Sequence, residues 1–286
     1  MTVAYDCDEN VVEVRVYLKE LEVVGAALMR VEGKQEPPYQ ESKACMPMDD
    51  PCIKRSLRAS KGDVSKAAKL LQSMLTWRSE LNYSTLTVSE FEPEIKSGKM
   101  YVQGNDAAGR SILVTRKRSE QPSDLGFDHY MRHLAFTLET ASRQMKGGAE
   151  AWVWIMDMGC MTRANSPPLS TSMATLTVLS SHFPERLHTC FFVDAPVIFG
   201  YLWAALSPFI DAVTKQKVIF VKSSEWRARM AAKAAGGGEG GGAASAAAAG
   251  SAVVPDGRDF ADYWSVFDSP YSEADYRALL SSFGWT

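Results

Sequence analysis

His129 and His133 are four residues apart, a spacing that places two imidazoles side by side on a helix. Imidazoles bind zinc when further protein ligands complete the site. Here no glutamate accompanies the pair as in an HExxH motif, and no third ligand is in reach along the chain. We therefore expect no metal site and no cofactor.

Asp157 ends the apolar run WVWIMD (152–157), at the strand end where open α/β sheets place their ligands. A single aspartate there more often accepts hydrogen bonds that cap a loop. The chain has no nucleophile elbow, and the glycines of GNDAAGR (104–110) lack the spacing of a phosphate-binding loop. We expect a protein that is not an enzyme, with a doubly wound α/β enzyme as an alternative.

Composition limits the compartment and the partners. The chain has 286 residues and a net charge of -3, which argues against a nucleic-acid partner. Its 5 cysteines form no CxxC pair, as is typical of a reducing compartment. No apolar run has the length of a membrane span, and the acidic N-terminus is unlike a targeting segment. We expect a cytoplasmic monomer that is either soluble or peripheral on membranes.

Residues 54–69 are strongly basic, with Asp63 as their only acid. Their basic side chains are Lys54, Arg55, Arg58, Lys61, Lys66 and Lys69. A basic face of this kind can attract anionic phosphate headgroups. An ordinary solvated helix surface has the same pattern, so the sequence leaves both interpretations open.

The stretch from His182 to Val221 is the main clue to function. Short β-branched and aromatic runs at 190–193 and 218–221 indicate buried strands. Between them, Val197–Leu206 is apolar on nearly every side of a short helix, with Pro196 suited to its first turn. This helix is either part of the core or a lid over an apolar ligand cavity.

Strands and helices alternate around these residues. Strands are predicted at 100–103, 112–115, 152–157, 190–193 and 218–221, and helices at 63–81, 89–96, 127–145, about 168–181 and 224–233. The alternation indicates an α/β fold with a mostly parallel sheet. Upstream, residues 11–31 have the spacing of an amphipathic helix that buries Val12 and Val16.

The chain divides into successive segments. Residues 1–48 form an N-terminal extension that is partly helical, residues 49–98 a helical N-terminal subdomain, and residues 99–233 an α/β lobe. Residues 234–250 have the Gly/Ala-rich composition of a flexible linker. Residues 251–286 are rich in aromatics and contain a helix start at Ser272, so they either fold back onto the lobe or bind a partner.

Six motifs occur in order between residue 50 and about residue 222: TWRSEL (76–81), GNDAAGRSILV (104–114), WVWIMDMG (152–159), FPERL (183–187), DAPVIF (194–199) and LSPFIDAVTKQKV (206–218). Together they resemble the CRAL-TRIO lipid-binding family. The resemblance implies a helical N-terminal subdomain and an α/β lobe whose apolar pocket is closed by a mobile gate helix, here residues 196–206. It implies a phospholipid or another hydrophobic molecule as ligand, and a transient membrane surface as partner.

In members of that family that transfer phosphatidylinositol, a glutamate and a lysine help to hold the inositol headgroup. The resemblance gives these roles to Glu185 of the PER motif and to Lys217. It adds Lys61, which is retained, whereas Ser60 beside it replaces a residue that is basic in those members. A carboxylate accepts hydrogen bonds from hydroxyls, and an ammonium offsets phosphate charge. The expected pocket and gate residues are Trp152, Trp154, Met156, Phe192, Ile198, Phe199, Leu202, Trp203, Leu206 and Phe209.

Trp152 and Trp154 depart from that pattern, because the transfer proteins carry small hydroxyl side chains at these positions. The tryptophans either line an apolar cavity or fill it. We therefore expect a non-enzymatic protein that binds, and transfers or presents, a phosphatidylinositol-like phospholipid or another hydrophobic ligand. A protein-interaction module with a filled pocket is the alternative.

Overall fold

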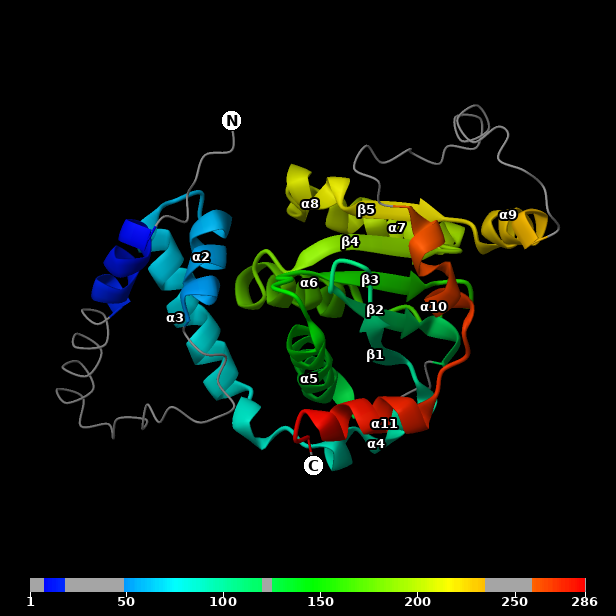
Figure 1. Cartoon of the computed structure of the whole chain (residues 1–286), viewed down its shortest axis with the longest axis horizontal. Helices are drawn as coiled ribbons and strands as arrows, with labels where there is room; N and C mark the ends of the chain where they lie inside the picture. Colours follow the sequence, from blue (N-terminus) through cyan, green and yellow to red (C-terminus); the bar gives the residue numbers. More distant parts are fainter. Residues whose placement is uncertain (1–7, 19–48, 120–124, 235–258, 286) are drawn as a thin grey trace. The chain divides into compact units, whose positions relative to one another are not determined.

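The chain separates into two compact units. The computed structural model describes residues 8–18, 49–119, 125–234 and 259–285. The helical unit combines residues 1–86 with residues 174–185, and the sheet unit combines residues 87–173 with residues 186–286 (Figure 1). The chain therefore returns to the N-terminal helices once, between two strands of the sheet.

The helical unit contains a helix over residues 8–18, α2 (Asp50–Ala59), α3 (Val64–Glu80), the 3-10 turn η1 (Tyr83–Thr85) and the π-helical turn η4 (Val178–His182). Aspartates start both long helices: Asp49 accepts a hydrogen bond from the Cys52 N–H, and Asp63 from the Lys66 N–H, each at 2.9 Å. The helix predicted at 63–81 is confirmed by α3. The core of the unit consists of Val11, Val14, Cys52, Ile53, Leu57, Ala67, Ala68, Leu71 and Met74.

The N-terminal helix buries a different face from the one predicted. Val11 and Val14 are buried, whereas Val12 and Val16 are 61% and 52% exposed. Valines at adjacent positions allow two helical phases, and packing against α2 and α3 favours the phase that the spacing alone did not indicate. The predicted continuation of this helix to residue 31 lies outside the described residues.

The sheet unit is built on a five-stranded sheet in the order β1 (Met100–Asn105), β2 (Ser111–Arg116), β3 (Trp152–Asp157), β4 (Leu187–Val193) and β5 (Val218–Val221). β1 pairs with β2 in antiparallel fashion, and the other neighbouring strands are parallel (Figure 1). The predicted α/β fold with a mostly parallel sheet is confirmed, and each predicted strand is present.

The other elements of the sheet unit are η2 (Val88–Phe91), α4 (Glu92–Ser97), η3 (Lys117–Ser119), α5 (Gly126–Gln144), α6 (Leu169–Thr177, which runs into the helical unit), α7 (Val197–Leu206), η5 (Ser207–Phe209), α8 (Ala212–Gln216), α9 (Ser223–Ala234), η7 (Phe260–Tyr263), α10 (Trp264–Asp268) and α11 (Glu273–Ser282). The helix predicted between the strands at 190–193 and 218–221 is confirmed by α7. Pro196 is its N-cap and precedes its first turn.

The register of the strands defines two faces of the sheet. One row consists of Met100, Thr115, Met156, Phe192 and Phe220 and crosses every strand. Side chains in register share a face, and Phe192 and Phe220 contact α7, so we call this the α7 face. The adjacent row, Val114, Ile155, Phe191 and Ile219, points to the opposite face.

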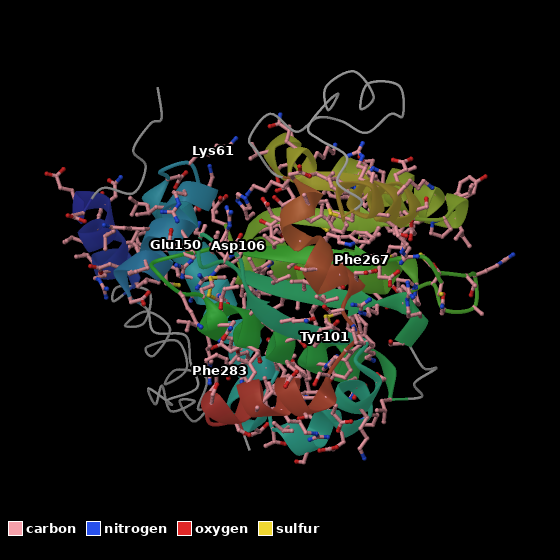
Figure 2. The ribbon with its side chains drawn as sticks, turned by 45° about the vertical axis from the view of Figure 1, so that its right-hand side comes forward. Lys61, Tyr101, Asp106, Glu150, Phe267 and Phe283 are labelled. Carbon is pink, nitrogen blue, oxygen red and sulfur yellow. The ribbon has the colours of Figure 1, made fainter. Side chains whose placement is uncertain are left out.

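The C-terminal segment, residues 259–285, covers the opposite face, which we call the C-terminal face. Phe260 and Tyr263 lie 5.0 and 5.3 Å from the ring of Phe191, measured between ring centroids. Arg116 donates hydrogen bonds from Nη2 to the carbonyls of Phe267 and Ser269, at 2.8 and 2.9 Å. α10, which carries Phe267, lies across the strands (Figure 2). Of the two predicted alternatives for this segment, the chain thus adopts the fold-back onto the lobe.

Candidate functional site

The α7 face is less completely covered than the C-terminal face. Thr115 and Met156 lie in interior strands on the α7 face, yet both are only half-buried. Their strand neighbours Val114 and Ile155 point to the C-terminal face and have no exposed surface. Interior strands of an α/β sheet are normally buried on both faces. The α7 face is therefore partly accessible near the carboxyl ends of β2 and β3, the sheet edge at which open α/β folds bind ligands.

Aromatic rings attach α7 to this face. The centroid of Phe199 lies 4.6 Å from that of Phe192, and the centroid of Trp203 lies 5.9 Å from Phe192 and 5.7 Å from Phe220. α7 contains no charged residue, and no side chain caps its N-terminus.

The predicted gate residues occupy several environments. Phe199 and Leu206 are buried, whereas Ile198, Leu202 and Trp203 are half-buried. Phe209 lies in η5 beside α7 and is 68% exposed. Its part in the pocket or gate stays a prediction.

An apolar surface covers the outer side of this region. Val197 and Tyr201 of α7 are 82% and 74% exposed, and Phe209 of η5 and Val213 of α8 are 68% and 63% exposed. Scattered exposed apolar residues are ordinary, but a group on consecutive elements is typical of an interaction surface. We call these four residues the outer apolar group.

The two tryptophans that depart from the family pattern lie on β3. Trp152 has no exposed surface, and the pairing of β3 with β4 shifts register beside it. Trp154 is 5% exposed and donates a hydrogen bond from Nε1 to Oγ1 of Thr115 at 2.9 Å. The indole of Trp154 therefore lies along the α7 face and reaches from β3 to β2.

The predicted headgroup residues lie in both units. Lys61 and Glu185 belong to the helical unit and are exposed, with φ angles of 54° and 57°. Lys217 belongs to the sheet unit, where it caps the C-terminus of α8 and is half-buried. The carbonyl of Lys217 accepts a hydrogen bond from the Cys190 N–H at 2.8 Å, which ties Lys217 to β4. A joint headgroup site made by the three residues stays a prediction.

The basic residues of the helical unit do not form one continuous face. Arg55 is buried at 4% exposure. Lys54 lies 2.9 Å from Asp8, and Lys66 lies 3.0 Å from Asp63. Part of the predicted basic face is therefore buried, or is paired with aspartates of the same unit.

The residues that first suggested chemistry have structural roles. Asp157 has no exposed surface; its Oδ1 accepts a hydrogen bond from the Gly159 N–H at 3.2 Å, and its Oδ2 lies 2.6 Å from Nη2 of Arg118. His129 lies 2.9 Å from Oε1 of Glu94. Within the described ranges, no group of three or more His, Cys, Asp or Glu side chains is arranged to hold a metal ion.

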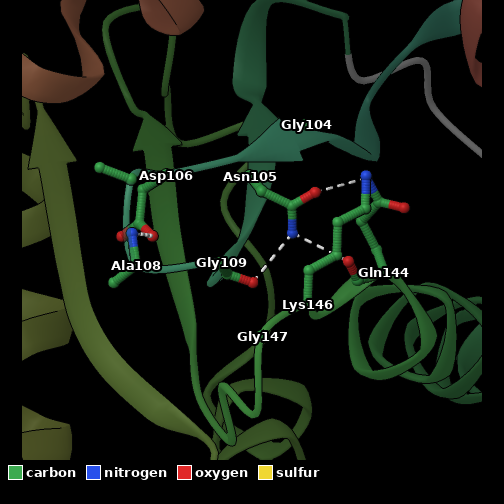
Figure 3. A pocket seen from close by; sticks show the side chains of 9 residues that line it. Gly104, Asn105, Asp106, Ala108, Gly109, Gln144, Lys146 and Gly147 are labelled. Atoms are coloured by element: carbon green, nitrogen blue, oxygen red, sulfur yellow. Dashed lines mark hydrogen bonds between the residues drawn. The ribbon is translucent and has the colours of Figure 1, made fainter.

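A separate depression of about 620 Å³ lies between the β1–β2 turn and the end of α5 (Figure 3). Its lining residues are Gly104, Asn105, Asp106, Ala107, Ala108, Gly109, Gln144, Lys146 and Gly147, which include none of the predicted pocket or headgroup residues. Asn105 donates hydrogen bonds to the carbonyls of Gly109 and Gln144, at 3.0 and 2.8 Å. These bonds tie the turn to the helix, so the depression is explained by loop anchoring.

Thr115 is the residue of this region that the sequence-based prediction missed. It lies on β2, and it stands out because its hydroxyl accepts a hydrogen bond from Trp154, 39 residues further along the chain. The strand itself was predictable, but its register against β3 is a property of the folded sheet. Local sequence carries no signal for this pair.

None of the helices in the described part of the chain is long and apolar enough to cross a membrane.

The fold matches a solved protein: the crystal structure of Sfh5 superposes with a TM-score of 0.52 over 73% of this chain and 80% of that chain, at 14% sequence identity. This similarity concerns the fold.

Sequence comparisons identify relatives of this chain. The phosphatidylinositol transfer protein PDR17 of Saccharomyces cerevisiae is 31% identical over 185 residues, covering 59% of this chain and 51% of that protein. The CRAL-TRIO domain-containing protein C23B6.04c of Schizosaccharomyces pombe is 30% identical over 171 residues, covering 59% of this chain and 17% of that protein. The chain thus spans about half or less of the length of these relatives. The family model of the CRAL/TRIO domain matches residues 95–235, which include the whole sheet and α7, so this part of the chain is a CRAL/TRIO domain.

Proposed function

We propose that this chain binds one phospholipid, or another hydrophobic molecule, between the α7 face of the sheet and α7, and that it transfers the ligand between membranes or presents it there. The observation that carries the proposal is an uncharged helix, attached by aromatic rings, over a sheet face that is only half-buried at its centre. The names of relatives such as PDR17, a phosphatidylinositol transfer protein, support a lipid as the ligand.

Apolar burial would supply most of the affinity. Each acyl CH₂ group removed from water contributes about 0.8 kcal/mol, so the first dozen carbons of one chain outweigh any single polar contact. The role of α7 in this proposal is that of a gate. The ligand enters when the rings of Phe199 and Trp203 leave Phe192 and Phe220, and it offers equivalent apolar contacts after entry.

The outer apolar group supports docking at a membrane. Val197, Tyr201, Phe209 and Val213 are exposed on and beside α7, so a membrane interface that accepts them also contacts the gate. Such a protein acts as a monomer and attaches peripherally to the cytoplasmic surface of membranes. The free thiols of Cys160 and Cys190 are compatible with that compartment.

Glu185 and Lys217, with Lys61, would select a phosphatidylinositol-like headgroup. The carboxylate accepts hydrogen bonds from ring hydroxyls, and the ammonium groups pair with the phosphate. No catalytic step is needed for binding and release.

A filled interaction module is the second candidate. The complete burial of Trp152 and the 5% exposure of Trp154 favour it, because two indoles inside the sheet unit take the volume of part of a ligand. In that case, α7 would present its outer surface to a protein partner and would not open.

Native mass spectrometry of the purified chain separates the two candidates. We expect a bound lipid under gentle ionisation, and we expect a Met156→Trp variant to lose it because the larger side chain occupies the half-buried centre of the α7 face. Met156→Leu, which preserves the volume, is the matched control and should retain the lipid. A chain that carries no lipid, and takes none up from vesicles, would support the filled module.

A further inference from the structure

We propose that Thr115 is a specificity-determining residue, whose hydroxyl donates a hydrogen bond to an ester carbonyl oxygen of the bound lipid. The inference rests on the proposed lipid-binding function and deepens it. It assigns the ligand to the class of acyl esters and makes Trp154 the residue that orients the Thr115 hydroxyl.

The hydrogen bond between Trp154 and Thr115 fixes which role the hydroxyl plays. Trp154 Nε1 can only donate, so Oγ1 of Thr115 is the acceptor at 2.9 Å. A threonine hydroxyl has one proton of its own to donate in addition. Within the described part of the chain, no side chain or carbonyl accepts this proton. Accepting a hydrogen bond also strengthens a hydroxyl as a donor.

The position of Thr115 directs this proton toward the ligand. Thr115 belongs to the row of Met100, Met156, Phe192 and Phe220, and it is the only hydrogen-bonding side chain of that row. Phe192 and Phe220 of the same row contact α7, so Thr115 lies on the same face of the sheet as the gate. Its half-burial means that a ligand lying on the row would cover the hydroxyl.

A ligand that covers the hydroxyl must satisfy it. Water can accept the proton while the site is open to solvent. Once a lipid expels that water, a ligand without an acceptor leaves a buried donor unpaired, which is unfavourable. An ester carbonyl beside the acyl chain removes this disadvantage, whereas an ether oxygen in the same place is a weaker and less accessible acceptor. The row therefore distinguishes acyl lipids from alkyl lipids of the same length.

The test compares diacyl and dialkyl lipids with the same headgroup and chain length. Phosphatidylinositol and phosphatidylcholine of both kinds are offered to the full chain in vesicles, and the bound lipid is quantified by mass spectrometry. For wild type, we expect about three- to tenfold more diacyl than dialkyl lipid, the range of one neutral hydrogen bond. Thr115→Val should bring the ratio to about one by lowering diacyl uptake, and Thr115→Ser, which keeps the hydroxyl, should retain it.

Several outcomes overturn the inference. One is a Thr115→Val variant that keeps the wild-type ratio of diacyl to dialkyl lipid. Another is a Thr115→Val variant that unfolds at the wild-type temperature but loses both lipids equally. Either result means that the hydroxyl does not bind the ester carbonyl. Wild type that binds both lipids equally also contradicts this inference, but it leaves the proposed function in place. Wild type that binds neither lipid contradicts both.

Discussion

His129 and His133 lie one turn apart on α5, and both contact the ring of Phe91, with centroid distances of 5.5 and 5.3 Å. They are bonded differently. His129 pairs with Glu94 at 2.9 Å, whereas His133 is 1% exposed, and no protein group within the described residues bonds to either of its ring nitrogens. Burial, reinforced by the charge of Lys99, lowers the pKa of His133 from 6.5 to about 3. His133 is therefore a neutral core residue.

This difference predicts a specific pH dependence. Because the pKa of His133 is lower in the folded chain than in the unfolded chain, stability is full above about pH 6.5 and falls as the pH drops toward 3. In His133→Leu, we expect the loss of unfolding free energy between pH 7 and pH 5 to shrink by about 2 kcal/mol. Urea unfolding at both pH values measures this, with His129→Leu, which should be destabilised at both, as the contrast. An unchanged pH slope in His133→Leu would contradict a neutral His133.

The headgroup assignment makes a second prediction at the residue scale. A Glu185→Ala, Lys217→Ala double variant should lose about tenfold or more in phosphatidylinositol binding, because hydrogen bonds to charged groups contribute about 1.5–3 kcal/mol. Its binding of phosphatidylcholine should change much less. Lys215→Ala, which changes an exposed lysine of α8, the short helix that Lys217 caps, is the matched control. Equal losses for both lipids would leave these residues without a role in headgroup selection.

At the scale of elements, α7 combines a buried inner side with an exposed outer side. Replacing Val197 and Tyr201 by Asp changes only the outer side, so the fold should tolerate it. We expect transfer between vesicles to fall at least tenfold. A carboxylate at these positions would have to lose its water of hydration before α7 could enter a membrane interface, and this desolvation is unfavourable. Leu169→Asp, at an exposed apolar position on α6, is the control and should transfer lipid normally. Normal transfer by the α7 variant would argue against the outer apolar group as the docking surface.

The elements themselves were largely predictable, whereas their contacts were not. The strands and α7 were recognised because short β-branched and aromatic runs, punctuated by glycine and proline, have a clear pattern. The N-terminal helix was assigned the wrong buried face because Val11 and Val12 are neighbours, and only packing on α2 and α3 decides between them. The pairing of Trp154 with Thr115 required the parallel register of β2 and β3, which local pattern does not determine.

At the scale of the whole molecule, the C-terminal segment completes the sheet unit from beyond the region that matches the family model. α11 lies beside α4 (Figure 1). Tyr271 donates a hydrogen bond to the carbonyl of Ile95 at 2.5 Å, and Arg277 pairs with Glu92 through bonds of 2.9 and 2.6 Å. Gly98 ends α4 with a φ of 65°, and a Cβ there would lie 2.3 Å from the Tyr271 ring. The sequence indicated a helix start at Ser272, but these long-range contacts depend on the finished sheet.

Removing residues 259–286 should therefore disrupt the sheet unit and not merely shorten the chain. The truncation exposes Phe191, which has no exposed surface in the intact chain, and deprives Arg116 of the carbonyls of Phe267 and Ser269. Replacing one buried phenylalanine or tryptophan by alanine lowers the free energy of unfolding by about 3–5 kcal/mol. Removing several buried aromatic side chains at once therefore lowers it by more than the total stability of a typical domain. We expect no cooperative thermal transition from the truncated chain by near-ultraviolet circular dichroism. Arg227→Ala, which removes an exposed pair with Asp268 at 3.3 Å, should unfold within a few degrees of wild type. A truncated chain that melts like wild type would show that the C-terminal face is stable without residues 259–286. The rest of the sheet unit would then fold without the C-terminal segment.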